Sequence, residues 1–287
     1  MRRHPLALIL SVFASCAAAE GVVTDHFQWK DPLAMGISGW EISADTPDRF
    51  ISVTDRGWFI EGRILREDDN IAAVEVDAVQ PILDHEGQPA AARRVRDWAD
   101  AEGLALLDDG SLVVGFERWM HVGQFQTTGS VREVLVGPRT FQDYSENRQL
   151  EAVAVHPDGR IFAWPERPRM GDQFETFVYD DGTWSNADTI PETDGYSIVG
   201  ADFASDGTLY LLERRLILAR WWQNRLRQVD QLEFQDARVI WTGDRNAFYN
   251  LEGVAVIEGA PRRLLLVGDN NNQKDRPTDI VEITLTD

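Results

Sequence analysis

Cysteine is nearly absent from this sequence. The 287 residues contain one, Cys16, and it lies in an N-terminal segment that we expect to be removed. The chain from Glu20 onward would then form no internal disulfide and no thiolate metal site. Its fold must be held by burial of apolar side chains. A hydrophobic content of 43% with ten Trp suffices for one large all-β domain.

Long apolar runs are missing as well. The most apolar stretch of the N-terminus, Leu6 to Phe13, is too short to span a bilayer. It follows two arginines and precedes three alanines, an order typical of a secretory signal peptide over residues 1–19. The residues before Cys16 match a lipoprotein cleavage site poorly, so we do not expect lipid anchoring there. We predict a periplasmic or secreted protein with one domain over residues 20–287.

Basic residues are few. The chain has 28 Lys and Arg against 48 Asp and Glu, a formal net charge of −20. Such a surface repels nucleic acid and anionic lipid, which excludes both as partners. A negatively charged substrate would be repelled too, unless bound cations invert the local potential. We expect a monomer that acts on a small molecule.

Several common catalytic motifs do not occur. The sequence has no Gly-x-Ser-x-Gly elbow, no His-Glu-x-x-His motif, no phosphate-binding glycine loop before a helix and no EF-hand loop. These absences argue against the serine-hydrolase, zinc-protease, P-loop and EF-hand classes. Helical patterns are also scarce, and we expect one short helix within Ala90 to Ala101.

What the sequence does contain is an internal repeat. Each copy has two apolar runs of four to six residues joined by a turn rich in Asp, Gly and Pro, which predicts a β-hairpin buried on both faces. Most copies begin with Glu and end with Glu-Arg or Asp-Asn. The copies are Glu102 to Arg118, Glu151 to Arg167, Val199 to Arg214 and Glu252 to Asn270, with a looser one from Ser38 to Gly57.

The repeat length predicts a β-propeller. The copies begin at residues 38, 102, 151, 199 and 252, so most steps are close to 50 residues, which suits one four-stranded antiparallel blade per copy. Five blades fit best, with an insertion in the first, and six are the alternative. Residues 280–285 would pair with the segment near Val22 to close the ring and cover the sheet edges.

The hairpin geometry gathers oxygen-bearing side chains at one end of the central channel. The residue that begins the first strand and the residue that ends the second lie at the same end of an antiparallel pair. An inner ring then contains Ser38, Glu102, Glu151 and Glu252, and an outer ring contains Asp55, Glu117, Glu166, Glu213 and Asp269. In the fourth copy Val199 aligns with the inner glutamates, and Ser197 or Asp202 could supply an oxygen instead.

The two histidines near these strands differ in position. His156 lies in an Asp-Gly turn and so belongs to the opposite face. His121 lies on the same face as the acids, either as an exposed rim residue or as a general base.

Three glutamates near one axis repel one another strongly, so they must stay protonated or bind a cation. Carboxylates and hydroxyls form a site for a hard cation, and calcium is the simplest candidate for an exported protein. The alternative is that the inner glutamates cap backbone amides at strand starts or pair with arginines from adjacent blades. An arginine follows most outer acids, at Arg56, Arg118, Arg167 and Arg214, and these arginines form either inter-blade salt bridges or an anion-binding rim.

The repeat as a whole resembles a known family. The segments that carry the likeness are Ser38-Gly-Trp-Glu, Glu102-Gly-Leu-Ala, Leu150-Glu-Ala-Val-Ala and Leu251-Glu-Gly-Val-Ala-Val, with their second strands. Together they resemble the phytase-like propeller domain described as esterase-like activity of phytase. The order of inner residues is also similar to the calcium site of five-bladed calcium-activated nucleotidases. That likeness implies calcium ligands at Ser38, Glu102, Glu151, Ser197 and Glu252.

These observations favour a calcium-dependent hydrolase of ester or phosphoester bonds. In this interpretation Glu117 or Glu166 orients the attacking water, and Arg56, Arg118 or Arg214 neutralises developing charge. A second hypothesis is a non-catalytic exported propeller in which calcium ties the blades together. A third is a lactonase-like hydrolase with Asn and Asp ligands, for which Asn250 and Asn270 are candidates.

Overall fold

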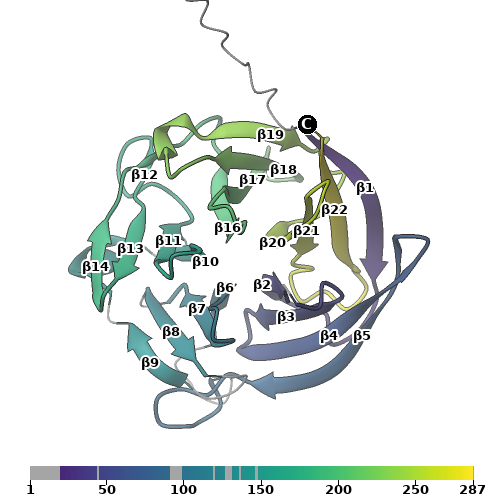
Figure 1. Cartoon of the computed structure of the whole chain (residues 1–287), viewed down its shortest axis with the longest axis horizontal. Coiled ribbons are helices and arrows are strands. Elements are labelled where there is room, and N and C mark those ends of the chain that lie inside the picture. The colour runs from purple at the N-terminus through teal and green to yellow at the C-terminus, as the bar shows by residue number, and fades with distance from the viewer. Residues whose placement is uncertain are drawn as a thin grey trace, which may run out of the picture.

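The computed structural model describes residues 20–43, 45–90, 99–118, 120–126, 131–135, 137–145 and 148–286. Five four-stranded antiparallel sheets surround a central axis like the blades of a propeller (Figure 1). This confirms the all-β, five-bladed prediction against the six-bladed alternative. The predicted signal peptide lies outside the described residues, as does most of the helix expected from Ala90 to Ala101. Ala101 itself begins a strand.

Each blade is numbered in chain order and its strands run from the axis outward. The first comprises β2 (Ile37–Ile42), β3 (Arg49–Thr54), β4 (Trp58–Glu67) and β5 (Asn70–Pro81). The second comprises β6 (Ala101–Leu106), β7 (Leu112–Phe116), β8 (His121–Phe125) and β9 (Val131–Leu135). The third comprises β10 (Leu150–Val155), β11 (Ile161–Pro165), β13 (Phe177–Asp180) and β14 (Thr183–Asn186).

The fourth blade comprises β16 (Ser197–Phe203), β17 (Leu209–Ile217), β18 (Trp221–Val229) and β19 (Arg238–Thr242). The fifth comprises β20 (Leu251–Ile257), β21 (Arg263–Gly268), β22 (Thr278–Thr286) and β1 (Glu20–Trp29). A small sheet of β12 (Gln173–Phe174) and β15 (Ile190–Pro191) accompanies them. Two short 3-10 helices cover Arg139–Asp143 and Phe234–Asp236. None of the described helices has the length and hydrophobicity of a membrane span.

Apolar packing between neighbouring blades holds the ring together. The inner strands β2, β6, β10, β16 and β20 contact one another in succession and close a circle around the axis. They are buried on both faces, because each lies between its own blade and the next. Trp40, for example, stacks on Phe50 with ring centres 4.4 Å apart, in a cluster shared by the first and fifth blades. This two-sided burial explains why the repeat shows continuous apolar runs rather than alternation.

The N-terminal strand closes the ring. β1 pairs antiparallel with β22, so that Val22 lies opposite Thr284, which confirms the predicted closure. A buried carboxylate reinforces the junction, because Glu282 accepts hydrogen bonds from Arg66 of the first blade and Arg263 of the fifth. β1 is thereby the outermost strand of the fifth blade.

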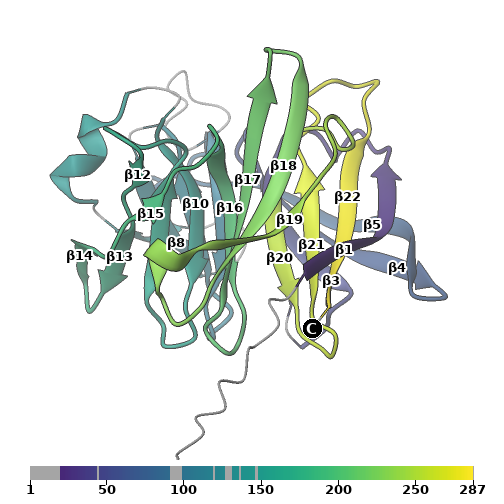
Figure 2. The ribbon, with the colours of Figure 1, turned by 90° about the horizontal axis from the view of Figure 1, so that it is seen from above.

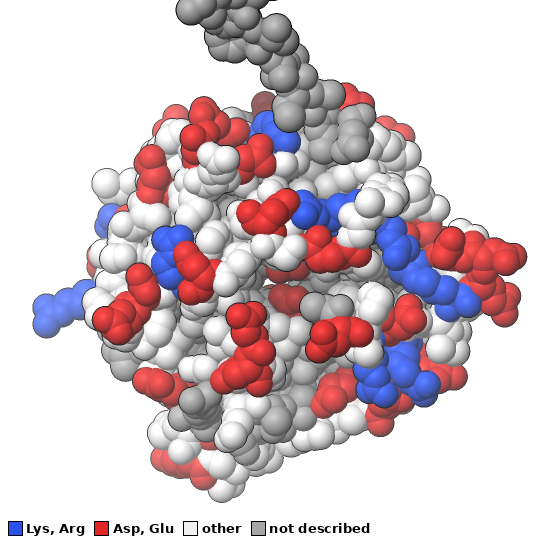
Figure 3. All heavy atoms as spheres, in the orientation of Figure 1, with Lys and Arg blue, Asp and Glu red and all other residues white. Residues whose placement is uncertain are grey.

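The Asp-Gly turns lie at one end of the channel, at the bottom of Figure 2. Their glycines, Gly110, Gly159 and Gly207, have φ values of 78°, 91° and 85°, a region that other residues adopt at a cost. His156 belongs to this end, as predicted, and pairs with Asp158 at 2.8 Å. Figure 3 views this face, where acidic groups surround the central opening and basic groups lie beside other acids.

Candidate functional site

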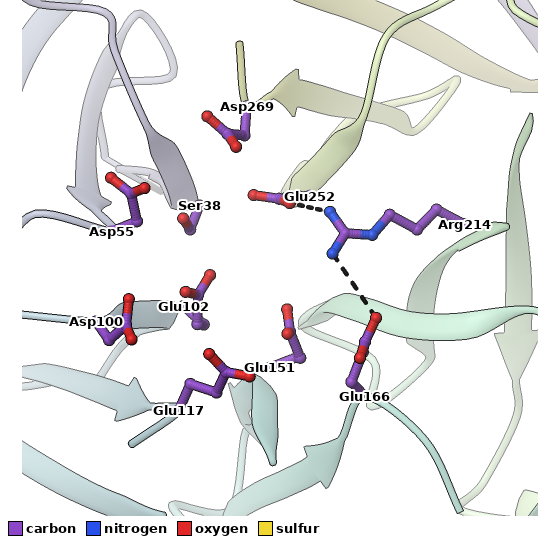
Figure 4. Close-up of a pocket in the computed structure, with 10 residues that line it drawn as sticks. All are labelled: Ser38, Asp55, Asp100, Glu102, Glu117, Glu151, Glu166, Arg214, Glu252 and Asp269. Carbon is purple, nitrogen blue, oxygen red and sulfur yellow. Dashed lines mark hydrogen bonds and ion pairs between the residues drawn. The ribbon is translucent and has the colours of Figure 1, made fainter. Parts of the chain in front are cut away.

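The candidate site begins with the same irregularity in every inner strand. Pairing between the first and second strand of each blade slips by one residue, leaving one residue of the first strand unpaired in a β-bulge. A bulge re-aims the extra side chain. The bulged residues are Ser38, Glu102, Glu151, Val199 and Glu252. The four polar ones converge at the mouth of the channel (Figure 4).

Glycine after the bulge lets the inner strands approach one another. A Cβ atom at Gly39 would lie 2.7 Å from the backbone nitrogen of Leu104, and one at Gly103 would lie 2.8 Å from that of Val153. Both distances are shorter than real Cβ contacts, so a side chain here would push adjacent blades apart. The Glu-Gly dipeptide of the repeat therefore has two roles, since Glu enters the mouth and Gly draws the blades together.

These side chains line a cavity of about 240 Å³. It contains all four polar bulge residues and four of the five predicted outer acids. The lining residues are Ser38, Asp55, Asp100, Glu102, Glu117, Glu151, Glu166, Arg214, Glu252 and Asp269. Asp100 was not predicted, because it lies in the loop two residues before a bulge, outside the repeated hairpin. The equivalent positions before the other bulges are Gly36, Gln149, Ser197 and Asn250, so the repeat carries no acidic signal that would have identified it.

The fourth blade departs from the others, and one prediction for it is wrong. Glu213 is fully buried and binds Arg225 and Arg227, so it does not belong to the outer ring. In the ladder Glu213 pairs with Ile198, and Arg214 pairs with Ser197. Arg214 therefore occupies the place that Asp269 or Glu166 has in other blades. Aligning the Glu-Arg pair of this blade with the Glu-Arg pairs of the others shifts the alignment by one residue, from Arg214 to Glu213.

Ser197 does not line the cavity, although its side chain is buried. Val199 occupies the bulge of the fourth blade, so that sector of the mouth carries an apolar residue and a cation where the others carry acids.

Arg214 neutralises one side of the cavity. It forms ion pairs with Glu252 and, at 3.8 Å, with Glu166 (Figure 4). It also donates a hydrogen bond of 2.8 Å to Asn250 Oδ1. Asn250 also donates to Glu252 through Nδ2. The predicted alternative of arginine pairing thus holds for two of the acids on this side.

The opposite side of the cavity gathers three acids that Arg214 does not reach. One carboxylate oxygen each from Asp100, Glu102 and Glu117 lie within 4.8 Å of one another. The Oγ of Ser38, which is 1% exposed, lines the same cavity and has no hydrogen-bond partner within the described part of the chain. The hydroxyl and the three carboxylates together form a set of oxygen atoms of the kind that a hard cation binds.

Four acids of the cavity have raised pKa values. Burial, followed by the charges of Glu151 and Asp100, raises the pKa of Glu102 well above its usual range. Burial and then Glu166 do the same for Glu151, although Arg214 offsets part of the effect. Burial also raises the pKa of Glu117 and that of Asp269, the latter to about 6. The cavity therefore favours either bound protons or a bound cation.

The other predicted residues, Arg56, Arg118 and His121, do not line the cavity. Arg56 is exposed and does not line the cavity. Arg118 is half-exposed and donates Nε to Asp100 at 2.7 Å. His121 stacks on Phe116 with ring centres 4.5 Å apart, and burial lowers its pKa to about 4. It is neither an exposed rim residue nor part of the cavity lining.

The two asparagines of the lactonase-like hypothesis make contacts within the protein. Asn250 binds Arg214 and Glu252, as described above. Asn270 donates to the carbonyl oxygens of Ala34 and Arg276 and accepts a long hydrogen bond from the nitrogen of Gly36. Asn270 lies in the loop between β21 and β22 of the fifth blade and contacts the segment that joins β1 to β2.

Comparison with solved structures finds other propeller-like chains at low sequence identity. The chain is similar to the PQQ-bound aldose sugar dehydrogenase of Streptomyces coelicolor, with a TM-score of 0.52 and 11% identity over 93% of this chain and 98% of that one. It is similar to the calcium-binding protein regucalcin of Agrobacterium tumefaciens, with a TM-score of 0.51 and 10% identity over 90% and 94%. A gluconolactonase of Xanthomonas campestris gives 0.50 and 10% over 90% and 89%. Such identities establish the fold alone.

Sequence comparison is more specific. No curated protein sequence matches the chain. The model of one protein family matches residues 33–272, which include all five inner strands and every residue that lines the cavity. The chain therefore belongs to the phytase-like family described as esterase-like activity of phytase.

Proposed function

We propose that this protein is a calcium-dependent hydrolase of ester or phosphoester bonds whose reaction takes place in the acidic cavity. The observation that carries the proposal is the convergence of Asp100, Glu102 and Glu117 beside the unsatisfied hydroxyl of Ser38. These groups lie across the cavity from Arg214, so a cation and a guanidinium would face each other. An anionic oxygen between them would be attracted to both.

The donor set suits a hard cation. Every candidate ligand atom is an oxygen, and the residues lining the cavity include no His and no Cys. Calcium accepts six to eight oxygen ligands, whereas zinc prefers nitrogen and sulfur. Asp100, Glu102, Glu117 and Ser38 would hold the ion, and Glu151 borders the same space. The raised pKa values of Glu102 and Glu117 support the fit, because a bound cation offsets both the cost of burying ionised carboxylates and their repulsion by neighbouring acids.

A bound calcium ion would supply Lewis-acid polarisation of the acyl or phosphoryl oxygen. Glu117 is assigned to the cation, which leaves Glu166 as the outer carboxylate that orients the attacking water and accepts its proton. The water oxygen bonds to the acyl carbon or phosphorus, the bond to the leaving oxygen breaks, and the alcohol leaves with a proton from solvent. Arg214 stabilises the negative charge that develops on the reacting group.

The test is hydrolysis of 4-nitrophenyl acetate and 4-nitrophenyl phosphate with calcium and with a chelator. Turnover of at least one substrate should require calcium, and Glu102→Gln should abolish the calcium response. Glu75→Gln is the matched control. Glu75 lies on β5, the outermost strand of the first blade, where it pairs with Arg63 and does not line the cavity. Absence of calcium-dependent turnover of both substrates would contradict the proposal. Calcium-dependent stabilisation without turnover would favour a purely structural ion.

A further inference from the structure

One hairpin beside the cavity is longer than its counterparts. β17 and β18 have nine residues each, whereas the equivalent second strands β7 and β11 have five. Past Arg214 the hairpin continues for three residues, roughly 10 Å at 3.3 Å per residue. Figure 2 shows it rising above the other blades at the end opposite the Asp-Gly turns. The fourth blade therefore forms a wall over one side of the mouth.

The face of this wall that carries Arg214 also carries an aromatic ring. Leu216 lies two residues after Arg214 and pairs with Trp222, so all three point to the same face. The Trp222 ring centre lies 5.3 Å from the guanidinium carbon of Arg214. Trp222 therefore lies directly next to Arg214, the residue that lines the cavity on this side.

A second ring from the fifth blade extends this surface. Tyr249 meets Trp222 edge to face, with ring centres 6.2 Å apart at 88°. The guanidinium of Arg276 lies over Tyr249 at 3.6 Å, and Asn271 donates to its hydroxyl at 3.1 Å. Trp222 and Tyr249 form what we call the aromatic row, and these contacts hold it in a defined orientation.

The aromatic row is only partly covered by the rest of the protein. Trp222 and Tyr249 are both partly exposed, and the wall also exposes Leu216 at 45% and Leu218 at 79%. An extension that exposes apolar side chains beside a reaction cavity is typical of a ligand-binding surface. The other sectors of the mouth carry mostly carboxylates, so an apolar part of a ligand would bind on the side of the fourth blade.

We propose that the aromatic row is a specificity subsite that binds a planar, apolar group of the substrate, such as an aryl group, while the reacting group lies between the acids and Arg214. The inference rests on the proposed function for the reacting group, and it adds the class of the group that does not react. Packing of a ring against Trp222 and Tyr249 is expected to favour an aryl over a methyl ligand about tenfold.

The experiment is a binding comparison that requires no chemistry. Phenylphosphonate and methylphosphonate are titrated into the calcium-loaded full protein by calorimetry. The unaltered protein should bind phenylphosphonate about tenfold more tightly. Trp222→Ala should remove that preference, Trp222→Phe should retain most of it, and Trp58→Ala should leave it unchanged. Trp58 is the matched control because it is 38% exposed in the first blade and does not line the cavity.

Equal affinity for the two phosphonates, no binding of either, or a preference that survives Trp222→Ala would overturn the inference. Failure of the proposed function has a different signature, namely absence of calcium-dependent turnover while the phosphonate preference and its loss in Trp222→Ala persist. Turnover in which Trp222→Ala lowers kcat/KM equally for aryl and alkyl esters would retain the hydrolase and refute the subsite.

Discussion

A partly buried carboxyl at the far end of the channel gives a prediction about stability. Asp202 lies three residues beyond the bulge of β16, and Glu41 occupies the same position in β2. The equivalent residues of the other blades are alanines, at Ala105, Ala154 and Ala255. Burial raises the pKa of Asp202 to about 7, even though the backbone N–H groups of Val256 and Phe203 favour its charged form. Burial and then the charge of Asp202 raise the pKa of Glu41.

The sign of the effect follows from the raised pKa. The folded protein holds the proton of Asp202 up to about pH 7, whereas the unfolded chain releases it near pH 3.9. The stability that this proton provides is present at low pH and is lost as the pH rises through 7. The difference corresponds to at most about 4 kcal/mol. Asp202→Asn should therefore match the unaltered protein near pH 4 and be more stable at pH 8.

Urea unfolding followed by tryptophan fluorescence at pH 5, 6, 7 and 8 measures this difference. Asparagine keeps an oxygen that can accept the 2.6 Å hydrogen bond from Val256 N–H. Asp206→Asn is the control, and its effect on stability should have the opposite sign. Hydrogen bonds from Thr208 and Arg262 lower the pKa of Asp206, although partial burial opposes this shift. A difference between Asp202→Asn and the unaltered protein that does not grow with pH would refute the reasoning.

Three further predictions concern the mouth. Gly103→Ala should lower the free energy of unfolding by about 1–3 kcal/mol, because its Cβ would overlap the backbone of Val153; urea unfolding checks this, and an unchanged midpoint contradicts it. Glu102→Gln should raise the melting temperature in calcium-free buffer at pH 8, because the raised pKa of Glu102 makes its ionised form unfavourable in the folded protein. An unchanged or lower melting temperature would contradict this. Arg214→Gln should reduce kcat/KM for the hydrolysed ester about a hundredfold in calcium, and retention of full activity would remove Arg214 from the reaction.

Much of the fold could be predicted because the repeat is strong. Two apolar runs around an Asp-Gly turn, repeated about every 50 residues, specify both the hairpin and the number of blades. The closure by residues 280–285 followed from the need to cover two sheet edges. The same geometry placed Glu102, Glu151 and Glu252 at one end of the channel, where the structure brings them together.

The fourth blade could not be aligned correctly from its motif. Glu117 and Glu166 each lie seven residues after the glycine of their turn, and so does Arg214 after Gly207. Counting from the turn predicts Arg214 at the mouth, whereas matching Glu-Arg to Glu-Arg selects Glu213. Turn geometry determines the register of a hairpin, and residue identity at its end does not.

Asp100 and the aromatic row were out of reach for a different reason. Asp100 belongs to an irregular loop, and the contact between Trp222 and Tyr249 joins β18 to the loop that precedes β20. Periodicity describes what the blades share. Periodicity does not identify the residues that differ from one blade to the next, and those residues form the asymmetric part of the site.

Calorimetric titration of calcium into the metal-free protein at pH 6 and pH 8 tests the central claim most directly. The raised pKa values of Glu102 and Glu117 mean that protons must leave before the ion binds, so affinity should rise from pH 6 to pH 8 with measurable proton release. Glu102→Gln should weaken binding strongly at both pH values. Absence of calcium binding at millimolar concentration, or binding that Glu102→Gln leaves unchanged, would contradict the account.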